Sequence, residues 1–333
     1  MARRVTITDV ARVAGVSVAT VSKVINNRYG VASETSAHVM RVVEDLGYQS
    51  SLVARSMRSQ RTDMIGILVG AFGPFSTEIL KGVDATLRDT PYDLLAYTGG
   101  RHGSASGWER RHLSRLSGTL VDGVILVTPS VVDVDATVPL VVIDPHVGPE
   151  DLPSVESDNF IGAVMATRHL LELGHRRIAF LAGRPGSRSS AQRFDGYRHA
   201  LDQAGIPVDA SLVTGDYYDP DTRNVPVFEL LSRPDRPTAI FAANDLSAIA
   251  TTQVAPVLGL RVPDDLSVIG FDDVPEAAQL RTPLSTVRQP LQQMGGAAAS
   301  LLLELLAGTK PEEEHVVLPT SLVRRTTTGP APA

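Results

Sequence analysis

The chain of 333 residues contains no cysteine and no long hydrophobic run. Without cysteine it cannot form disulfide bonds, a thiol nucleophile or a thiolate metal site. No apolar run approaches the roughly 18 residues that span a membrane, and the opening MARRVTITDVARVAG lacks the apolar segment of about 7–15 residues that marks a signal peptide. We therefore expect a cytoplasmic protein with no membrane contact.

Sequence motifs typical of enzymes are also absent. The chain has no G-x-S-x-G elbow, no G-x-x-x-x-G-K-[ST] loop and no G-x-G-x-x-G fingerprint, and its eight histidines show no H-E-x-x-H spacing. His175, in LGHRRI, is predicted to have a structural role in a turn before a strand. Trp108 is predicted to be a packing residue of a surface helix, with a stacking platform as the alternative. We therefore expect no catalytic residue, no metal and no cofactor.

The net charge of −6 is distributed unevenly along the chain. Residues 1–61 hold nine lysines and arginines against four acids, a net charge of +5, so residues 62–333 carry −11. A basic segment ahead of an acidic body is typical of a protein whose first part binds a polyanion. Charge alone equally allows a solvated basic surface, so the motifs must decide.

The segment TITDVARVAGVSVATVSKVINN predicts two short helices around a tight turn. Thr8 is placed to cap the first helix, and Gly15 supplies the left-handed residue that ends it. The second helix starts at Ser17, and a third follows from about Ser33. Apolar residues on one face of each helix predict a shared core: Val10, Ala11, Ala14, Val21, Val24, Ile25, Val39, Val42, Val43 and Leu46.

This spacing is that of a helix-turn-helix, whose second helix lies in the major groove of DNA. A three-helix protein-binding module is the alternative. The outward side chains of the second helix are small or form hydrogen bonds, and Lys23 adds a cation. Together with the positive charge of the segment, they favour DNA.

The chain resembles the lactose-repressor (LacI) family of transcription regulators along nearly its whole length. The matching segments, in order, are VTITDVARVAGVSVATVSKVINN, VASETSAHVMRVVEDLGY, ARSMRSQRTDMIGILV, GVILVTP, LLELGHRRIAFLAG, QRFDGYRHAL, AIFAANDLSAI, DLSVIGFDD and PLSTVRQP. The resemblance implies that Val18, Ala19 and Lys23 read base edges. Lys23 stands where the family usually has arginine, and it cannot make the same bidentate contact to guanine. The other implied DNA-binding residues of this module are Thr6, Thr8, Ser17, Thr20, Ser22, Asn26 and Tyr48.

Residues 50–61 match the hinge helix of this family, which forms against DNA and inserts an apolar lever into the minor groove. Met57 occupies the lever position, where leucine is usual, and Val53 and Ala54 are implied to pack beside it. Serines stand at 50 and 51, where the family commonly has Pro-Asn, so the start of the helix is less fixed. We expect this segment to be disordered or loosely helical without DNA, because so short a helix is marginal alone.

From residue 62 onward, continuous apolar strands alternate with helices, a pattern typical of parallel sheets covered on both faces. We expect a helix-turn-helix domain over 1–49, a hinge over 50–61 and a large domain over 62–327. The resemblance makes the large domain a periplasmic-binding-protein-like α/β core of two doubly wound lobes. We place the first lobe at about 62–157 and 289–317, the second at about 158–287 and 318–327, and a flexible tail at 328–333.

Polar residues at the ends of the predicted strands mark a ligand site, because parallel strands present their carboxyl ends to one cleft. Asp, Asn and Arg side chains with an aromatic neighbour suit a hydroxylated ligand. The alternative is that strand-end Asp and Asn cap the following helices, which we rate at least as highly for Asp245 and Asp273. The expected effector-binding residues are Phe72, Phe75, Asp144, Arg193, Tyr217, Asn244 and Asp272.

These observations predict a regulator that binds double-stranded DNA at a palindromic operator. We expect a homodimer, because no apolar heptad follows LVRRTTT that could join two dimers into a tetramer. We expect a repressor of carbohydrate uptake or utilisation genes, controlled by a sugar or oligosaccharide between the lobes. A purine-like or protein corepressor is an alternative, and so is a solute-binding protein without DNA function.

Overall fold

The computed structural model describes residues 5–25, 29–47, 61–99, 108–117, 120–129, 137–145, 152–215 and 224–332. The chain divides into two compact units, residues 1–62 and 63–333. No helix among the described residues is long and apolar enough to cross a membrane. The first unit holds α1 (Ile7–Ala14), α2 (Val18–Ile25) and α3 (Ser33–Asp45).

The start of α1 differs from the prediction, because Thr6 and not Thr8 caps this helix. The Thr6 hydroxyl accepts a hydrogen bond from the Asp9 amide at 3.3 Å, and the Asp9 carboxylate accepts one from the Thr6 amide at 3.0 Å. This reciprocal pair satisfies two free amides of the first turn. The end of α1 is as predicted, since Gly15 has a left-handed φ of 66°.

The predicted core of the first unit is confirmed. Val10, Val21 and Val39 are fully buried, one from each helix, so the three helices share a single apolar interior. The other predicted members are buried or packed against this interior: Ala11, Ala14, Val24, Ile25, Val42, Val43 and Leu46.

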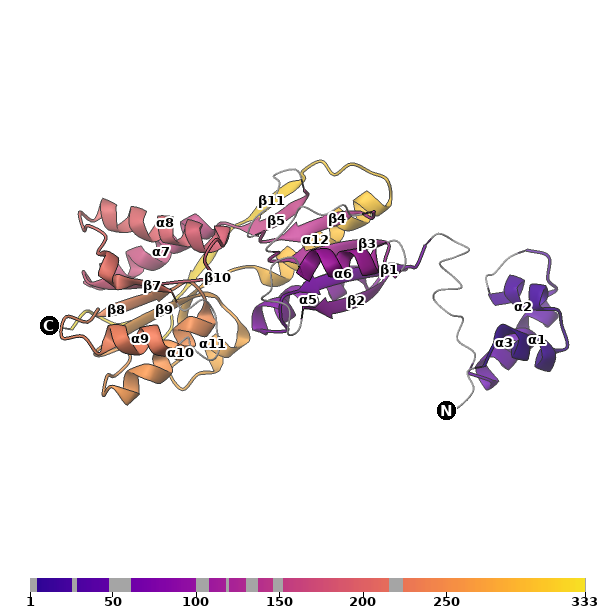
Figure 1. Ribbon diagram of the computed structural model, residues 1–333, viewed down its shortest axis with the longest axis horizontal. Helices are drawn as coiled ribbons and strands as arrows, with labels where there is room; N and C mark the ends of the chain where they lie inside the picture. The colour runs from indigo at the N-terminus through magenta and orange to yellow at the C-terminus, as the bar shows by residue number, and fades with distance from the viewer. Residues whose placement is uncertain are drawn as a thin grey trace. The chain divides into compact units, whose positions relative to one another are not determined.

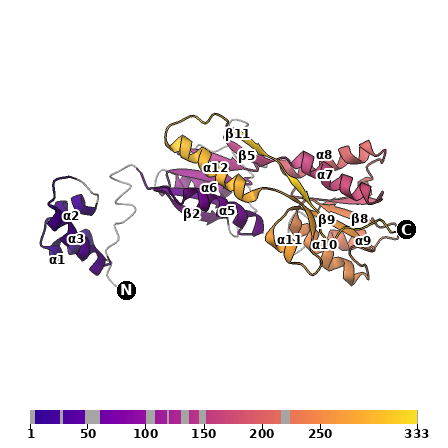
Figure 2. The ribbon, with the colours of Figure 1, turned by 180° about the vertical axis from the view of Figure 1, so that it is seen from behind.

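The second unit contains two sheets, each with six described strands (Figures 1 and 2). The first sheet is parallel, in the order β11 (His315–Leu318), β5 (Ser154–Ser157), β4 (Leu140–Ile143), β3 (Gly123–Val127), β1 (Met64–Val69) and β2 (Asp93–Thr98). The second has the order β12 (Ser321–Val323), β10 (Ser285–Arg288), β9 (Ser267–Asp272), β8 (Ala239–Ala242), β6 (Ile178–Ala182) and β7 (Val213–Gly215), with only β12 antiparallel to its neighbour.

Helices cover both faces of each sheet, as near-continuous apolar strands require. In the first lobe, α6 (Trp108–Leu116) covers one face, and α5 (Pro74–Leu87) and α12 (Leu291–Leu306) cover the other. Trp108 is buried in the core beneath α6, as predicted.

Helices likewise cover the second sheet on both sides (Figure 1). On one side lie α7 (Asn159–Glu172) and α8 (Arg188–Gln203). On the other lie α9 (Asn224–Leu231), α10 (Asp245–Val257) and α11 (Pro275–Gln279), and a 3-10 turn (Ala210–Leu212) precedes β7. The predicted fold class, a helix-turn-helix unit and an α/β core of two doubly wound lobes, is therefore confirmed.

Within the residues that the structure describes, the chain crosses between the two lobes three times. The crossings lead from β5 to α7, from β10 to α12, and from β11 to β12. Two crossings leave β5 and β11, which are neighbours at one edge of the first sheet. The crossing from β10 begins beside β12, where the crossing from β11 ends. All three crossings therefore lie together. Side chains near these crossings can therefore contact both lobes.

Residues 328–332 are part of the second lobe, and the expectation of a flexible tail is wrong for them. The Gly329 carbonyl lies 3.1 Å from Nε2 of His175, and its amide donates to the Ser267 hydroxyl at 3.0 Å. His175 and Ser267 are both fully buried, so the tail supplies partners that water cannot. The predicted structural role of His175 is confirmed by these contacts.

Ending the chain after Thr327 removes the hydrogen bonds of Gly329 to His175 and Ser267, and those of Thr328 to His169 and Ser285. It is expected to lower the free energy of unfolding by about 2–4 kcal/mol, because each such hydrogen bond contributes about 0.5–1.5 kcal/mol. Urea unfolding followed by circular dichroism measures the loss. A chain ending after Gly329 keeps the contacts to His175 and Ser267 and should lose only about 1 kcal/mol. Equal losses in the two truncations would contradict this role of Gly329.

Candidate functional sites

The face of α2 that points away from the core of the first unit is exposed. Ser17, Val18, Ala19 and Lys23 are exposed, and Thr20 and Ser22 are half-buried, while Val21 and Val24 face the interior. The Ser17 hydroxyl accepts a hydrogen bond from the Thr20 amide at 3.0 Å and so caps the helix. A helix with an apolar inner face and an outer row of small, hydroxyl and cationic side chains can enter a DNA groove.

Some predicted site residues lie outside the described part of the chain. These are Asn26, Tyr48, Val53, Ala54, Met57 and Tyr217. Thr6 and Thr8 are exposed at the start of α1.

The second candidate site lies where β4 and β9 end. Asp144 follows β4 with a φ of 50°, and Asp272 ends β9 with a φ of 123°. Such values are unfavourable for residues other than glycine, and observed strain of this kind points to function. Both side chains are buried, although carboxylates rarely are unless they have partners.

Five buried side chains connect this edge to the interlobe crossings. We call them the buried ring; its members are Ser157, Asn159, Arg193, Asp272 and Gln289. Arg193 Nε donates to Asn159 Oδ1 at 2.8 Å, and its Nη1 donates to the Ala243 carbonyl. Nη1 also lies 3.7 Å from Asp272 Oδ1, within ion-pair distance.

Gln289 closes the buried ring from the crossing between β10 and α12. Its Nε2 donates to Asp272 Oδ1 at 2.7 Å, and its Oε1 accepts from the Ser157 hydroxyl at 2.5 Å. Asn159 Nδ2 donates to the Ser157 carbonyl at 3.1 Å. Ser157 and Asn159 flank another crossing, so the ring joins β9 and α8 to two of the three crossings.

Arg193 retains hydrogen-bonding capacity for a ligand. Its guanidinium has five N–H donors, and within the described residues its two hydrogen bonds engage two of them. The Phe271 ring covers one face of the guanidinium, at 3.8 Å from ring centroid to Cζ. The group is thus held rigidly by its neighbours with donors to spare.

Asn244, Asp245 and Asp273 make protein contacts of their own. Asn244 caps α10, since its Oδ1 accepts from the Ser247 amide at 2.7 Å, a contact that does not use its Nδ2 donor. Asp245 accepts from the Val274 amide at 2.9 Å, and Asp273 forms an ion pair with Arg325 at 2.6 Å. Asp245 and Asp273 are therefore structural, but they anchor neighbouring segments and do not cap helices.

Phe72 and Phe75 lie near the start of α5 and differ in burial. Phe72 is 56% exposed, whereas Phe75 is partly buried against the core of the first lobe. An aromatic ring that exposed can contact a ligand or a partner without moving.

Burial raises the pKa of Asp272 to about 6, against an opposing effect of Arg193. Burial and the Asp272 charge also raise the pKa of Asp245 well above its ordinary value, so the two carboxyls titrate together. For an acid whose pKa is raised by folding, stability is greatest below the unfolded value of 3.8 and falls as the pH rises toward 6.

Asp272→Asn is therefore expected to remove a pH-dependent loss of stability. Between pH 4 and pH 7 the stability of the natural chain should fall by about 2 kcal/mol through this site, because one unit of pKa shift corresponds to about 1.4 kcal/mol and part of the loss has already occurred at pH 4. Urea unfolding of both chains across this range measures the difference, with the exposed Asp235→Asn as a control. Parallel pH profiles for the natural chain and Asp272→Asn would contradict the expectation.

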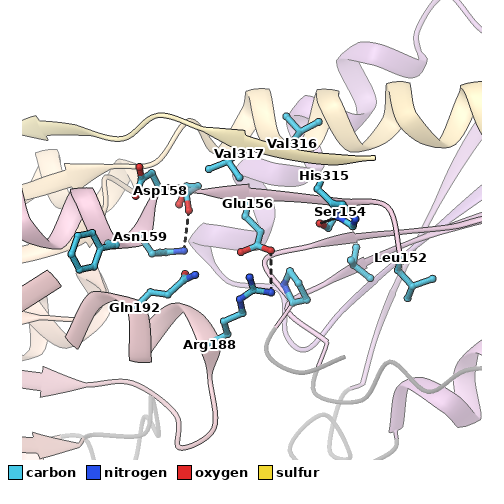
Figure 3. Close-up of a pocket in the computed structure, with 14 residues that line it drawn as sticks. Leu152, Ser154, Glu156, Asp158, Asn159, Arg188, Gln192, His315, Val316 and Val317 are labelled. Atoms are coloured by element: carbon cyan, nitrogen blue, oxygen red, sulfur yellow. Dashed lines mark hydrogen bonds and ion pairs between the residues drawn. The ribbon is translucent and has the colours of Figure 1, made fainter. Parts of the chain in front are cut away.

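An open groove of about 850 Å³ adjoins the buried ring (Figure 3). The face of β5 and β11 forms its floor, and the first turns of α7 and α8 form a wall. Arg188 and Glu156 point toward one another across it, 3.7 Å apart (Figure 3). Its lining residues are Val142, Pro145, Leu152, Ser154, Glu156, Ser157, Asp158, Asn159, Phe160, Arg188, Gln192, His315, Val316 and Val317.

Sequence reasoning predicted Arg193 and Asp272 but missed the residues that hold them. These three residues, Ser157, Asn159 and Gln289, lie at the interlobe crossings. They were missed because the prediction considered polar residues at the ends of strands. Their only sequence signal is position: a polar residue on either side of Asp158, and a glutamine before Pro290.

Comparison with known proteins identifies both units. Residues 6–51 match the family of bacterial regulatory proteins called lacI, and residues 167–328 match the periplasmic binding protein-like domain. The ribose operon repressor of Haemophilus influenzae is 33% identical over 326 residues, which cover 96% of this chain and 97% of that repressor. The chain belongs to the LacI family.

Solved structures of LacI-family regulators match this chain over nearly its full length. A transcriptional regulator CelR in complex with cellobiose has a TM-score of 0.73 at 34% identity, covering 97% of this chain and 100% of that one. A lac repressor dimer bound to operator and the anti-inducer ONPF has a TM-score of 0.83 at 26% identity, covering 98% and 100%. The chain is thus a LacI-family DNA-binding regulator with an effector-binding domain, and the family consists of transcription regulators and not enzymes.

Proposed function

We propose that this regulator is a repressor of carbohydrate uptake or utilisation genes. It binds a palindromic operator as a homodimer in the cytoplasm, and a sugar between its lobes controls that binding. The resemblance to the ribose operon repressor and to the CelR–cellobiose complex supports a sugar. The lac repressor dimer on its operator supports the dimer and the DNA site.

The buried ring is the main structural support for a sugar effector. Sugars offer hydroxyl groups that both donate and accept, and the ring offers both partners: the guanidinium of Arg193 and the carboxylate of Asp272. Asp144 and Asn244 would complete the site from neighbouring strand ends. In this proposal Thr6, Thr8, Ser17, Val18, Ala19, Thr20, Ser22 and Lys23 contact DNA.

The position of the buried ring at the interlobe crossings would couple sugar binding to operator binding. A sugar that binds Arg193 and Asp272 more tightly in one arrangement of the lobes would favour that arrangement. The shift in operator affinity cannot exceed this difference, which is typically about 1–3 kcal/mol in allosteric proteins.

Operator binding with and without sugars tests the proposal. DNA from upstream of the protein's own gene is titrated with the full-length chain at fixed salt, alone and with each member of a mono- and oligosaccharide panel. At least one sugar should change the affinity by about 5–150-fold, as that coupling energy requires. Specific DNA binding that no sugar alters would contradict sugar control, and a lack of specific DNA binding would contradict the operator.

A further inference from the structure

The groove beside the buried ring has a polar floor where a sheet face is usually apolar. In the parallel register, Ser154 pairs with His315 and Glu156 with Val317, so these four side chains share one face of the first sheet. Further along the same face, apolar residues of β4, β3 and β1 lie beneath α6. Over β5 and β11 the face carries hydrogen-bonding groups, with Ser154 Oγ 3.0 Å from His315 Nδ1.

The environment of Glu156 is the main evidence that this groove binds a ligand, because it differs from that of a residue in a packed or fully solvated sheet edge. Its side chain is only 13% exposed, and burial raises its pKa despite Arg188 nearby. The 3.7 Å separation from Arg188 is an ion pair but is longer than a hydrogen bond. Among the described residues, no group donates a hydrogen bond to this carboxylate. A half-buried carboxylate with open acceptor sites, facing a cavity, suits a ligand that donates hydroxyl hydrogens.

The groove adjoins the effector site of the proposed function. Asn159 lines the groove and also accepts the hydrogen bond from Arg193 Nε. Pro145, on the opposite side, directly follows Asp144. A ligand held by Arg193 and Asp272 would therefore lie beside the groove, which Asn159 and Pro145 border on two sides.

We propose that the groove binds a further ring of an oligosaccharide effector whose first ring is held by Arg193 and Asp272. This inference rests on the proposed function and names the class of effector: a neutral oligosaccharide of two or more units. Hydroxyls of the further ring donate to Glu156 and accept from Arg188. Leu152 and Val317 give the C–H face of that ring an apolar surface.

The charge and size of the groove support this class of ligand. Glu156 and Arg188 balance one another, and the Asp158 carboxylate caps α7 by accepting from the Ile161 amide at 2.9 Å. An anionic sugar would face two carboxylates and one arginine, so a neutral one is favoured. The volume of about 850 Å³ lies toward the upper end of the range of roughly 300–1,000 Å³ typical of small-molecule pockets, so the groove has room for a sugar ring.

Isothermal titration calorimetry of the full-length chain tests the proposal with three matched series. The probes are glucose, cellobiose and cellotriose; glucose, maltose and maltotriose; and xylose, xylobiose and xylotriose. In the series that binds, the disaccharide should bind at least tenfold more tightly than its monosaccharide. Glu156→Leu should abolish this gain and leave the monosaccharide Kd within twofold.

Two further variants separate ligand binding from folding. Val317→Trp fills the groove from a position on β11 that is 61% exposed, so it should also remove the disaccharide gain without disturbing the core. Glu172→Leu removes an exposed carboxylate from the far end of α7 and should leave both affinities unchanged. Circular dichroism confirms that each variant is folded.

Three outcomes would overturn the proposal. Equal affinities for a monosaccharide and its disaccharide would show that the groove contributes nothing. Equal weakening of both sugars by Glu156→Leu would place Glu156 in the support of the first site. Binding of no sugar in any series would contradict the sugar effector itself, and this inference with it; the first two outcomes leave the proposed function intact.

Discussion

Replacing Arg193 with methionine should abolish the response to effector and lower the free energy of unfolding by about 3–5 kcal/mol, the usual cost of breaking a buried ion pair. The Arg193 side chain is 4% exposed and that of Asp272 8%. Without the guanidinium, the pKa of Asp272 should rise further, so this buried carboxyl must either take up a proton or stay charged with only Gln289 as a side-chain donor among the described residues. The Ala243 carbonyl and Asn159 Oδ1 lose their donor as well.

Two control variants test whether these losses come from the buried guanidinium of Arg193. Arg198→Met removes an arginine from the same helix, where its side chain is 57% exposed, and should cost less than about 1 kcal/mol. Arg193→Lys retains the charge but not the planar fork, so it should recover part of the stability and little of the effector response. Urea unfolding measures stability, and operator titration with and without the active sugar measures the response. A normal sugar response in Arg193→Met would refute the effector site.

Ala19→Glu should weaken operator binding about a hundredfold or more, because a carboxylate in the major groove meets the negative potential of DNA and like charges at an interface cost several kcal/mol. Ala19 is exposed on α2 and contributes nothing to the core of the first unit, so folding should not change. The helical circular dichroism signal should match that of the natural chain.

Met40→Glu provides the charge-matched control for this prediction. Met40 is 44% exposed on α3, in the same unit, and its substitution adds the same negative charge. Fluorescence anisotropy with operator and with random DNA should show a large specific loss for Ala19→Glu and a small, general loss for Met40→Glu. Equal losses from both variants would place base reading elsewhere than α2.

The sequence predicted the helices of the first unit well because they depend on local chemistry. Gly15 ends α1 and Ser17 caps α2 through contacts within four residues. The cap of α1 was misplaced because two threonines, Thr6 and Thr8, stand two residues apart, and only the reciprocal bonds with Asp9 distinguish them.

The proposed effector site could be predicted only in part because its contacts are long-range. Strand ends and family motifs identify Arg193 and Asp272, but the ring that fixes them brings together residues far apart in the chain. Ser157 and Gln289 are separated by 132 positions, and no periodicity links them. The groove escaped prediction for the same reason, since its floor pairs β5 with a strand near the end of the chain.

The position of β11 and β12 has a consequence for protein synthesis. Each is an edge strand of its sheet, and residues 326–331 pack against the second lobe after them. The three-helix unit can fold as soon as it emerges from the ribosome, but neither lobe has all its strands until the final segment has been translated. A chain released early would carry a folded recognition unit on an incomplete core, and we expect cellular proteases to degrade it more readily than the finished protein.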